Sequence, residues 1–165
     1  MSLNSLENPK NSQTLYGLTD KLNLFVDLYY KEKLPKVLML TGNKGIGKST
    51  LVSHLMHTIY DKENYDRKKN YIIKKTAFHT QYSDNAFNNI IYLSGDNYKN
   101  IKIDDIRVLK SQLLKSTISS EKRFIILDDV ELFNKNSLNA LLKIVEEPSL
   151  KNYFILINNK TKKLI

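Results

Sequence analysis

The segment from residue 40 to residue 50, LTGNKGIGKST, places three glycines, a lysine and a serine at the spacing of a phosphate-binding loop. Glycines permit left-handed turns that aim successive backbone N–H groups inward, and the start of a following helix adds its positive end. Lys48 can reach the outer phosphates of a nucleotide, while the hydroxyl of Ser49 can bind Mg²⁺. The residues assigned to binding ATP or ADP are Gly42, Asn43, Lys44, Gly45, Ile46, Gly47, Lys48, Ser49 and Thr50.

The segment FIILDDVE supplies the carboxylate that such a loop needs. Asp128 follows an apolar run, and an acidic residue at the tip of a neighbouring strand holds Mg²⁺, usually through its water shell. Two acids at a strand end can also form a solvated turn, but the phosphate-binding pattern upstream favours the metal role. Ser49 and Asp128 are therefore the predicted Mg²⁺ ligands.

Helices and strands alternate along the chain. Apolar residues at helical spacing predict helices over residues 18–32, 48–60, 102–116 and 136–147. Apolar runs predict strands over residues 36–41, 89–95, 123–129 and 152–158. The alternation predicts an α/β fold with a mostly parallel central sheet flanked by helices, and 165 residues suffice for a single domain. Residues 61–88 are interpreted as a basic, polar connector within that domain.

The same patterns predict which side chains form the core. Strand 36–41 is continuously apolar, which suits a strand covered on both faces of a parallel sheet. The helical residues expected at core-facing spacing are Ile106, Leu109, Leu113, Leu138, Leu141, Leu142 and Val145.

Composition excludes several kinds of site. The chain has no cysteine, which rules out disulfides, thiolate catalysis and thiolate zinc sites. His54, His57 and His79 are expected to be packing or surface residues rather than metal ligands. No apolar run approaches the roughly 20 residues that span a bilayer, and the N-terminus lacks the apolar segment of a signal peptide, so we expect a cytoplasmic protein.

The net charge of +9 has two interpretations. Lys and Arg side chains that neutralise phosphates gain affinity by releasing counterions, which favours contact with DNA. Abundant lysine throughout the chain favours a compositional bias instead, and the densest run, residues 66–75, lacks the glycine-aromatic signature of RNA-binding motifs.

Residues 127–149, LDDVELFNKNSLNALLKIVEEPS, resemble the Walker B segment and following helix of AAA+ clamp loader subunits, most closely the delta-prime subunits of bacterial DNA polymerase III. Residues 8–17 and the segment IKIDDIRVL are similar to two further blocks of this family. The resemblance implies a three-layer P-loop NTPase fold that places Leu15 and Tyr16 near the adenine. It also implies that Asn159, with Asn158 as second choice, is the sensor 1 residue that reads the terminal phosphate.

The resemblance also implies partners. They are the gamma or tau and delta subunits of a hetero-oligomeric ring, and through it the sliding clamp and primed DNA. Two features depart from the family. Many relatives insert a four-cysteine zinc module near residues 61–88, so no zinc is expected here. The sequence also ends before the family's arginine-finger motif, lid and collar domains, which indicates an N-terminal portion.

Residue 129 separates two functions. Active relatives place a glutamate after the magnesium aspartate, where it orients the attacking water, whereas this chain has Asp129, a weak substitute. Because about 1 Å of misplacement can cost about 10²-fold in rate, we expect little or no hydrolysis and a largely structural, delta-prime-like role. The alternative is an active gamma- or tau-type ATPase. A P-loop small-molecule kinase is disfavoured, because the three arginines are scattered.

The acidic pair Glu146 and Glu147 is expected at the C-terminal end of the last predicted helix, where the helix dipole disfavours negative charge. Solvation is one explanation for this placement. A basic group supplied by a neighbouring subunit is the other.

Overall fold

The computed structural model describes residues 12–95, 101, 103–114 and 122–161. Its elements, in chain order, are α1 (Thr19–Tyr30), β1 (Val37–Thr41), α2 (Lys48–Tyr60), the 3-10 turn η2 (Lys62–Asn64), β2 (Tyr65–Asp66), β3 (Tyr71–Ile72), α3 (Ala77–Ser83), β4 (Ile90–Ser94), α4 (Ile103–Leu114), β5 (Arg123–Asp128), the 3-10 turn η3 (Val130–Leu132), α5 (Lys135–Val145) and β6 (Asn152–Asn158). Parts of two predictions, residues 8–11 of the N-terminal block and positions 102 and 115–116 of a helix, lie outside the described residues.

The chain packs as two compact units. The first, which we call the helical unit, comprises residues 1–34 and 47–87. The second, the sheet unit, comprises residues 35–46 and 88–165. The helical unit holds α1 to α3 and the β2–β3 hairpin, whereas the sheet unit holds the four long strands with α4 and α5.

The sheet unit is built on a parallel sheet with the strand order β1-β6-β5-β4. All three neighbouring pairs are parallel, with Leu127 of β5 opposite Leu156 of β6 and Ser94 of β4 opposite Asp128 of β5. The predicted α/β class and parallel sheet are confirmed. Because every strand runs the same way, the carboxyl ends of all four meet along one edge.

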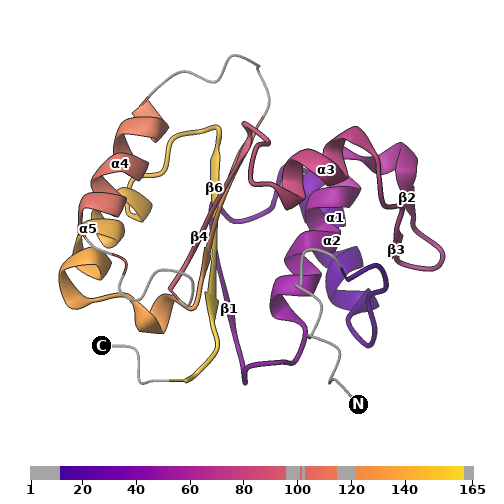
Figure 1. Ribbon diagram of the computed structural model, residues 1–165, viewed down its shortest axis with the longest axis horizontal. Coiled ribbons are helices and arrows are strands. Elements are labelled where there is room, and N and C mark those ends of the chain that lie inside the picture. Colours follow the sequence, from indigo (N-terminus) through magenta and orange to yellow (C-terminus); the bar gives the residue numbers. More distant parts are fainter. Residues whose placement is uncertain (1–11, 96–100, 102, 115–121, 162–165) are drawn as a thin grey trace. The chain divides into compact units, whose positions relative to one another are not determined.

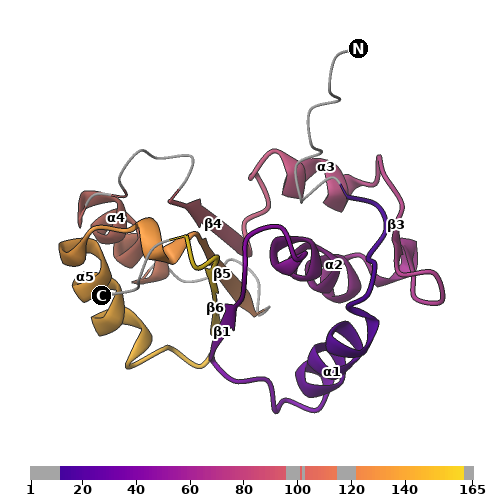
Figure 2. The ribbon, with the colours of Figure 1, turned by 90° about the horizontal axis from the view of Figure 1, so that it is seen from below.

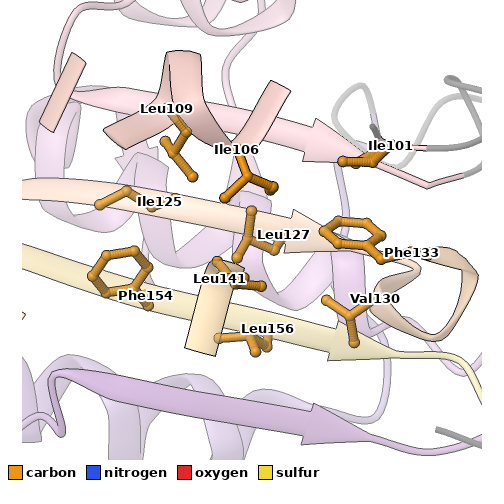
Figure 3. Close-up of a cluster of buried hydrophobic side chains, with 10 residues drawn as sticks. All are labelled: Ile101, Ile106, Leu109, Ile125, Leu127, Val130, Phe133, Leu141, Phe154 and Leu156. Carbon is orange, nitrogen blue, oxygen red and sulfur yellow. The ribbon is translucent and has the colours of Figure 1, made fainter. Parts of the chain in front are cut away.

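Helices α4 and α5 cover one face of this sheet (Figure 1). Ile106 and Leu109 of α4 and Leu141 of α5 pack on alternate residues of β5 and β6, as Figure 3 shows. Side chains from the segments that precede α4 and follow β5 extend this core toward the carboxyl edge. The full cluster is Ile101, Ile106, Leu109, Ile125, Leu127, Val130, Phe133, Leu141, Phe154 and Leu156.

Two core predictions are wrong. Leu142 is 51% exposed, because the buried stripe of α5 centres on Leu141 and the next residue lies about 100° around the helix. Ile144, on the other side of the stripe, packs against the core instead. In β1, Val37 and Met39 are exposed, because among the described residues this strand pairs with β6 alone and forms an edge of the sheet.

Helix α5 also ends earlier than expected, at Val145. Glu146 is its C-cap, and its N–H donates to the carbonyl of Leu142. Glu147 precedes Pro148, and the residue before a proline is disfavoured in the helical conformation. The exposed pair Glu146 and Glu147 therefore follows the helix rather than forming its last turn.

In the helical unit, α1 and α3 both pack against α2. The predicted connector over residues 61–88 is wrong as to structure, because this segment forms η2, a short antiparallel hairpin and α3. The Thr76 hydroxyl caps α3 by accepting from the His79 N–H at 3.0 Å. Phe78 and Tyr82 of α3 stack on one another beside His57 of α2, so this segment supplies part of the core. Among the described residues, no helix is both long and apolar enough to cross a membrane.

Candidate functional site

The ends of the strands bring two of the predicted motifs together within the sheet unit. Thr41, the last residue of β1, lies opposite Asn158 of β6, and the Gly42 N–H donates to the Asn158 carbonyl at 3.2 Å. Residues 42–46, the first half of the predicted phosphate loop, thus leave the same edge of the sheet at which β5 ends in Asp128.

The predicted phosphate loop has the strand, turn and helix context that the motif requires. It follows β1 and runs directly into α2, which begins at Lys48. Gly45 and Gly47 have φ angles of 89° and 90°, in the left-handed region that glycine enters without steric cost. Gly47 is also the N-cap of α2, and a Cβ there would lie 3.2 Å from the Leu18 side chain. Lys48, Ser49 and Thr50 therefore form the first turn of α2, within the helical unit.

Asn159 links the two aspartates that follow β5. Its side-chain amide donates to Asp129 at 2.7 Å and to Asp128 at 3.2 Å. Asp128 and Asp129 are only 5% and 4% exposed, so each carboxylate is held in a buried hydrogen-bond network. The second-choice residue, Asn158, instead accepts from the Lys160 N–H at 2.8 Å. The geometry thus places Asn159, and not Asn158, against the acidic pair.

Asp129 has an unusual backbone and an unusual charge environment. Its φ of 52° lies in the left-handed region, a conformation that Asp tolerates better than most residues. Burial raises the pKa of its carboxyl group; the Asn159 hydrogen bond opposes that rise, and the neighbouring Asp128 adds to it. The cation of Lys44, from the phosphate loop, also opposes the rise. The acidic pair therefore concentrates negative charge beside a lysine of the loop.

Glu131, the next acid along the chain, contacts the segment that follows β6. Its carboxylate accepts from the backbone N–H groups of Asn159 and Thr161 at 3.1 and 3.2 Å and from the Thr161 hydroxyl at 2.7 Å. Burial alone would raise the pKa of Glu131, but these hydrogen bonds outweigh it and lower the pKa. Glu131 thus fixes the segment that carries Asn159.

The sequence interpretation missed three residues of β4 and its end. The Tyr92 hydroxyl donates to Asp128 at 2.9 Å, and the Ser94 hydroxyl lies 3.4 Å from Asp129. Gly95 then passes so close to the acidic pair that its N–H donates to the Asp128 carbonyl at 3.0 Å. Ser94 and Asp128 each end an apolar run, which indicates that both lie at strand ends. The sequence does not show which strands are neighbours or how their residues pair, so the contact was not predicted.

Replacing Gly95 by alanine is expected to destabilise the protein by about 2 kcal/mol, because an added Cβ would overpack a backbone that is already in contact. That Cβ would lie 2.7 Å from the Asp129 carbonyl oxygen and 2.9 Å from Leu132 Cβ. Gly17→Ala is the control, since no atom lies within 4 Å of a Cβ there and its φ of 68° adds only about 1 kcal/mol. Urea unfolding followed by circular dichroism compares the two, and equal losses would contradict the close contact.

The predicted adenine contacts lie in the helical unit. Leu15 is buried, and its N–H donates to the Asn70 carbonyl at 3.2 Å, whereas Tyr16 is 83% exposed. A stacking role for Tyr16 and a packing role for Leu15 stay predictions.

Magnesium fits the chemistry of the acidic pair. Within the described part of the chain, no group of three or more His, Cys, Asp or Glu side chains is arranged to hold a metal ion. Mg²⁺ does not need such a cage, because it keeps several waters and is bound through one or two carboxylates together with nucleotide phosphates. A buried carboxylate pair at the edge from which the phosphate loop leaves is a suitable donor set for that mode.

A second feature of the sheet unit is a basic groove between α4 and α5. It has a volume of about 350 Å³ and an apolar floor that includes Ile106 and Ile144. Arg107, Lys110 and Lys143 line its sides. Arg107 also pairs with Asp104 at 2.8 Å, but both of these side chains are at least 70% exposed, so the pair neutralises the groove weakly.

The parallel sheet, with a glycine-rich loop leaving its first strand and an acidic pair ending a neighbouring one, defines the class as an α/β protein of the P-loop type. A solved structure of a DNA polymerase III gamma subunit-related protein from Thermotoga maritima superposes with a TM-score of 0.59 over 86% of this chain and 40% of its own. At 19% identity, this likeness shows the fold, which is that of the clamp loader subunits. The predicted AAA+ fold is thereby confirmed.

Residues 17–165 match the model of the family described as DNA polymerase III, delta subunit, and the chain belongs to this family. Among curated relatives, the DNA polymerase III subunit delta' of Buchnera aphidicola subsp. Baizongia pistaciae is 25% identical over 83% of the chain and 42% of that protein. The delta' subunit of Buchnera aphidicola subsp. Schizaphis graminum is 39% identical over 38% of the chain and 19% of that protein. The chain thus spans less than half the length of these relatives.

Proposed function

We propose that the chain acts as a delta-prime-like subunit of a clamp loader, which grips ATP or ADP with Mg²⁺ and hydrolyses it weakly or not at all. In this proposal it assembles with gamma or tau and delta subunits in the cytoplasm and helps load the sliding clamp onto primed DNA. Family membership supports the general role, and the carboxyl edge of the sheet supports the nucleotide site.

The observation that carries the proposal is the hydrogen bonding of Asp129. A residue that activates water must be within reach of that water and free to accept its proton. Asp129 is 4% exposed, and its two carboxylate oxygens face Asn159 at 2.7 Å and Ser94 at 3.4 Å. These contacts favour a structural role for Asp129, and its side chain, one carbon shorter than that of glutamate, favours the same role.

The other residues of the site bind and orient. The backbone amides of residues 42–49 and the Lys48 ammonium would hold the phosphates, and Ser49 and Asp128 would hold Mg²⁺, which neutralises phosphate charge when bound. Tyr92 and Asn159 would fix the orientation of the Asp128 carboxylate through the contacts at 2.9 and 3.2 Å. Asn159 would also connect the terminal phosphate to the acidic pair.

The basic groove between α4 and α5 supports contact with DNA. Arg107, Lys110 and Lys143 present three cations along one concavity, a composition suited to a phosphate backbone. Its amide side chains, Asn136 and Asn139, add hydrogen-bond donors that phosphate oxygens accept.

Single-turnover hydrolysis tests whether the chain binds ATP without hydrolysing it. We expect the purified chain to convert bound ATP to ADP at the background rate, and we expect Asp129→Ala to leave that rate unchanged, because Asp129 does not activate water. Lys48→Ala, assayed at an ATP concentration too low for this weakened variant to bind it, sets the background. Measurable turnover that collapses in Asp129→Ala would contradict the proposal and identify an active, gamma- or tau-type ATPase instead.

A further inference from the structure

The β2–β3 hairpin of the helical unit carries a concentrated positive charge that the function above does not use. Residues 66–75, which comprise the turn, β3 and the segment directly after it, contain five cations, Arg67, Lys68, Lys69, Lys74 and Lys75, and a single acid. The helical unit has eleven Lys and Arg against eight Asp and Glu, a net charge of +3. Residues 66–75 alone carry a net charge of +4, so the rest of the unit has a net charge of −1. Within this unit the positive excess therefore lies in residues 66–75, while the sheet unit carries the remaining +6 of the chain's charge.

The single acid of the hairpin does not cancel this charge. Asp66 Oδ1 accepts from the backbone N–H groups of Lys68 and Lys69 at 3.0 and 3.1 Å. This carboxylate therefore closes the turn, while the side chains of Arg67, Lys68 and Lys69 are exposed. The arrangement places three consecutive cations on the outside of a hydrogen-bonded turn.

The base of the hairpin is anchored in the helical unit. Tyr65 and Ile72, opposite one another in β2 and β3, are 5% and 1% exposed. Asn70, in the left-handed region at a φ of 48°, donates from its side chain to the Thr19 hydroxyl of α1 at 2.8 Å. The Ile72 N–H donates to the Gln13 carbonyl at 2.8 Å. Figures 1 and 2 show the turn projecting outward beyond α2.

An anchored turn reduces the entropy lost when its cations bind a partner. Arg67 is further oriented by a hydrogen bond of 3.0 Å from its guanidinium group to Asn23 Oδ1 of α1. The turn is convex and formed mainly of lysines, which act as point charges without directional requirements. Such a surface suits a regular polyanion better than a peptide, which needs a groove for its side chains.

We propose that this basic hairpin is a second contact for double-stranded DNA, in which Lys68 and Lys69 bind the phosphate backbone without reading its sequence. Duplex DNA carries one negative charge per roughly 1.7 Å of its axis, so adjacent cations meet phosphates in any register. DNA is the polyanion that the proposed function supplies, and the inference rests on it to that extent. The hairpin is separate in sequence from the groove between α4 and α5, which lies in the other unit.

Fluorescence anisotropy with a labelled duplex of mixed sequence, over a series of salt concentrations, tests this contact. For Lys68→Gln/Lys69→Gln we expect at least a tenfold loss of affinity near 0.1 M salt and a salt dependence reduced by about two in slope, roughly one for each lysine. The matched control is Lys21→Gln/Lys33→Gln, which removes the same charge from two exposed positions of the helical unit. We expect this control to bind as the unmodified chain does.

Three outcomes would overturn the proposal. They are unchanged binding in the hairpin variant, an equal loss in the control, and hairpin-dependent binding of polyglutamate but not of DNA, which would indicate an acidic protein partner. Arg107→Gln/Lys143→Gln shows separately what the groove contributes. The assay contains no nucleotide and no other subunit, so a failure here leaves the nucleotide proposal standing, and circular dichroism checks that each variant is folded.

Discussion

Acidification from pH 7 to pH 4 is expected to destabilise the helical unit by several kcal/mol. His54 and His57 are 0% and 1% exposed, and burial lowers the pKa of each from 6.5 to about 4. Each pKa is lower in the folded state than in the unfolded state, so the unfolded state binds protons first as the pH falls. The stability from neutral burial is complete above pH 6.5 and is lost toward pH 4, at about 3 kcal/mol for each histidine.

The contacts of these histidines explain why the lowering is large. His57 Nδ1 lies 2.9 Å from the Ser53 carbonyl and His57 Nε2 lies 3.3 Å from His79, so a charged His57 would face a second imidazole inside an aromatic cluster. His54 lies 2.8 Å from the Tyr65 hydroxyl and 3.1 Å from the Ser12 carbonyl. The carbonyls and, at His57, Asp61 favour the charged form, but burial outweighs them.

Urea unfolding at a series of pH values, followed by circular dichroism, measures this effect. His54→Gln/His57→Gln should be less stable at pH 7 yet lose most of the change between pH 6.5 and pH 4. His79→Gln is the comparison variant: His79 is itself buried, at 8% exposed, and burial lowers its pKa too, but the variant keeps His54 and His57 and should retain most of the pH dependence. A pH dependence that survives in the double variant would show that other groups cause it.

In the sheet unit, the sequence was sufficient to predict the type and order of the helices and long strands, because each has a clear pattern of apolar residues. Apolar runs placed β5 and β6, because buried parallel strands need apolar side chains on both faces. The acidic residues that end β5 are recognisable because an acid directly after such a run must lie at a strand tip. Asn159 was found only through the family resemblance, since nothing in its local sequence distinguishes it from Asn158.

The rest of the site depends on register and on backbone conformation, which single-sequence patterns do not encode. Tyr92 meets Asp128 only because β4 pairs with β5 with Ser94 opposite Asp128. The hairpin at residues 65–72 was missed because its strands are two residues long and too short to show alternation. Helix α3 was missed for a similar reason, as it has seven residues and its aromatic side chains lie within a polar segment.

Replacing Lys48 by alanine is expected to reduce the affinity for ATP and ADP by about 100-fold, because a charge-assisted bond to phosphate contributes about 1.5–3 kcal/mol. Lys48 begins α2, directly after the left-handed turn at Gly47, so its ammonium is positioned by the same residues that aim the backbone amides. Titration calorimetry with Mg²⁺ present measures the change. Lys44→Ala is the matched control, since it removes the same charge from an exposed position of the same loop.

A loss of only a few-fold is expected in Lys44→Ala, because a loop lysine outside the helix start contributes only long-range attraction. Equal losses in the two variants would show that the loop attracts nucleotide through its general charge rather than through a built phosphate site.

The variant Asp128→Asn tests the contribution of the metal separately from that of the phosphate loop. It should weaken binding when Mg²⁺ is present and leave it unchanged in a chelator, because only the metal-bridged contact requires the carboxylate. Weakening under both conditions would instead mean that Asp128 supports the loop itself, since its carboxylate also accepts from Tyr92 and Asn159 at the sheet edge from which the loop leaves.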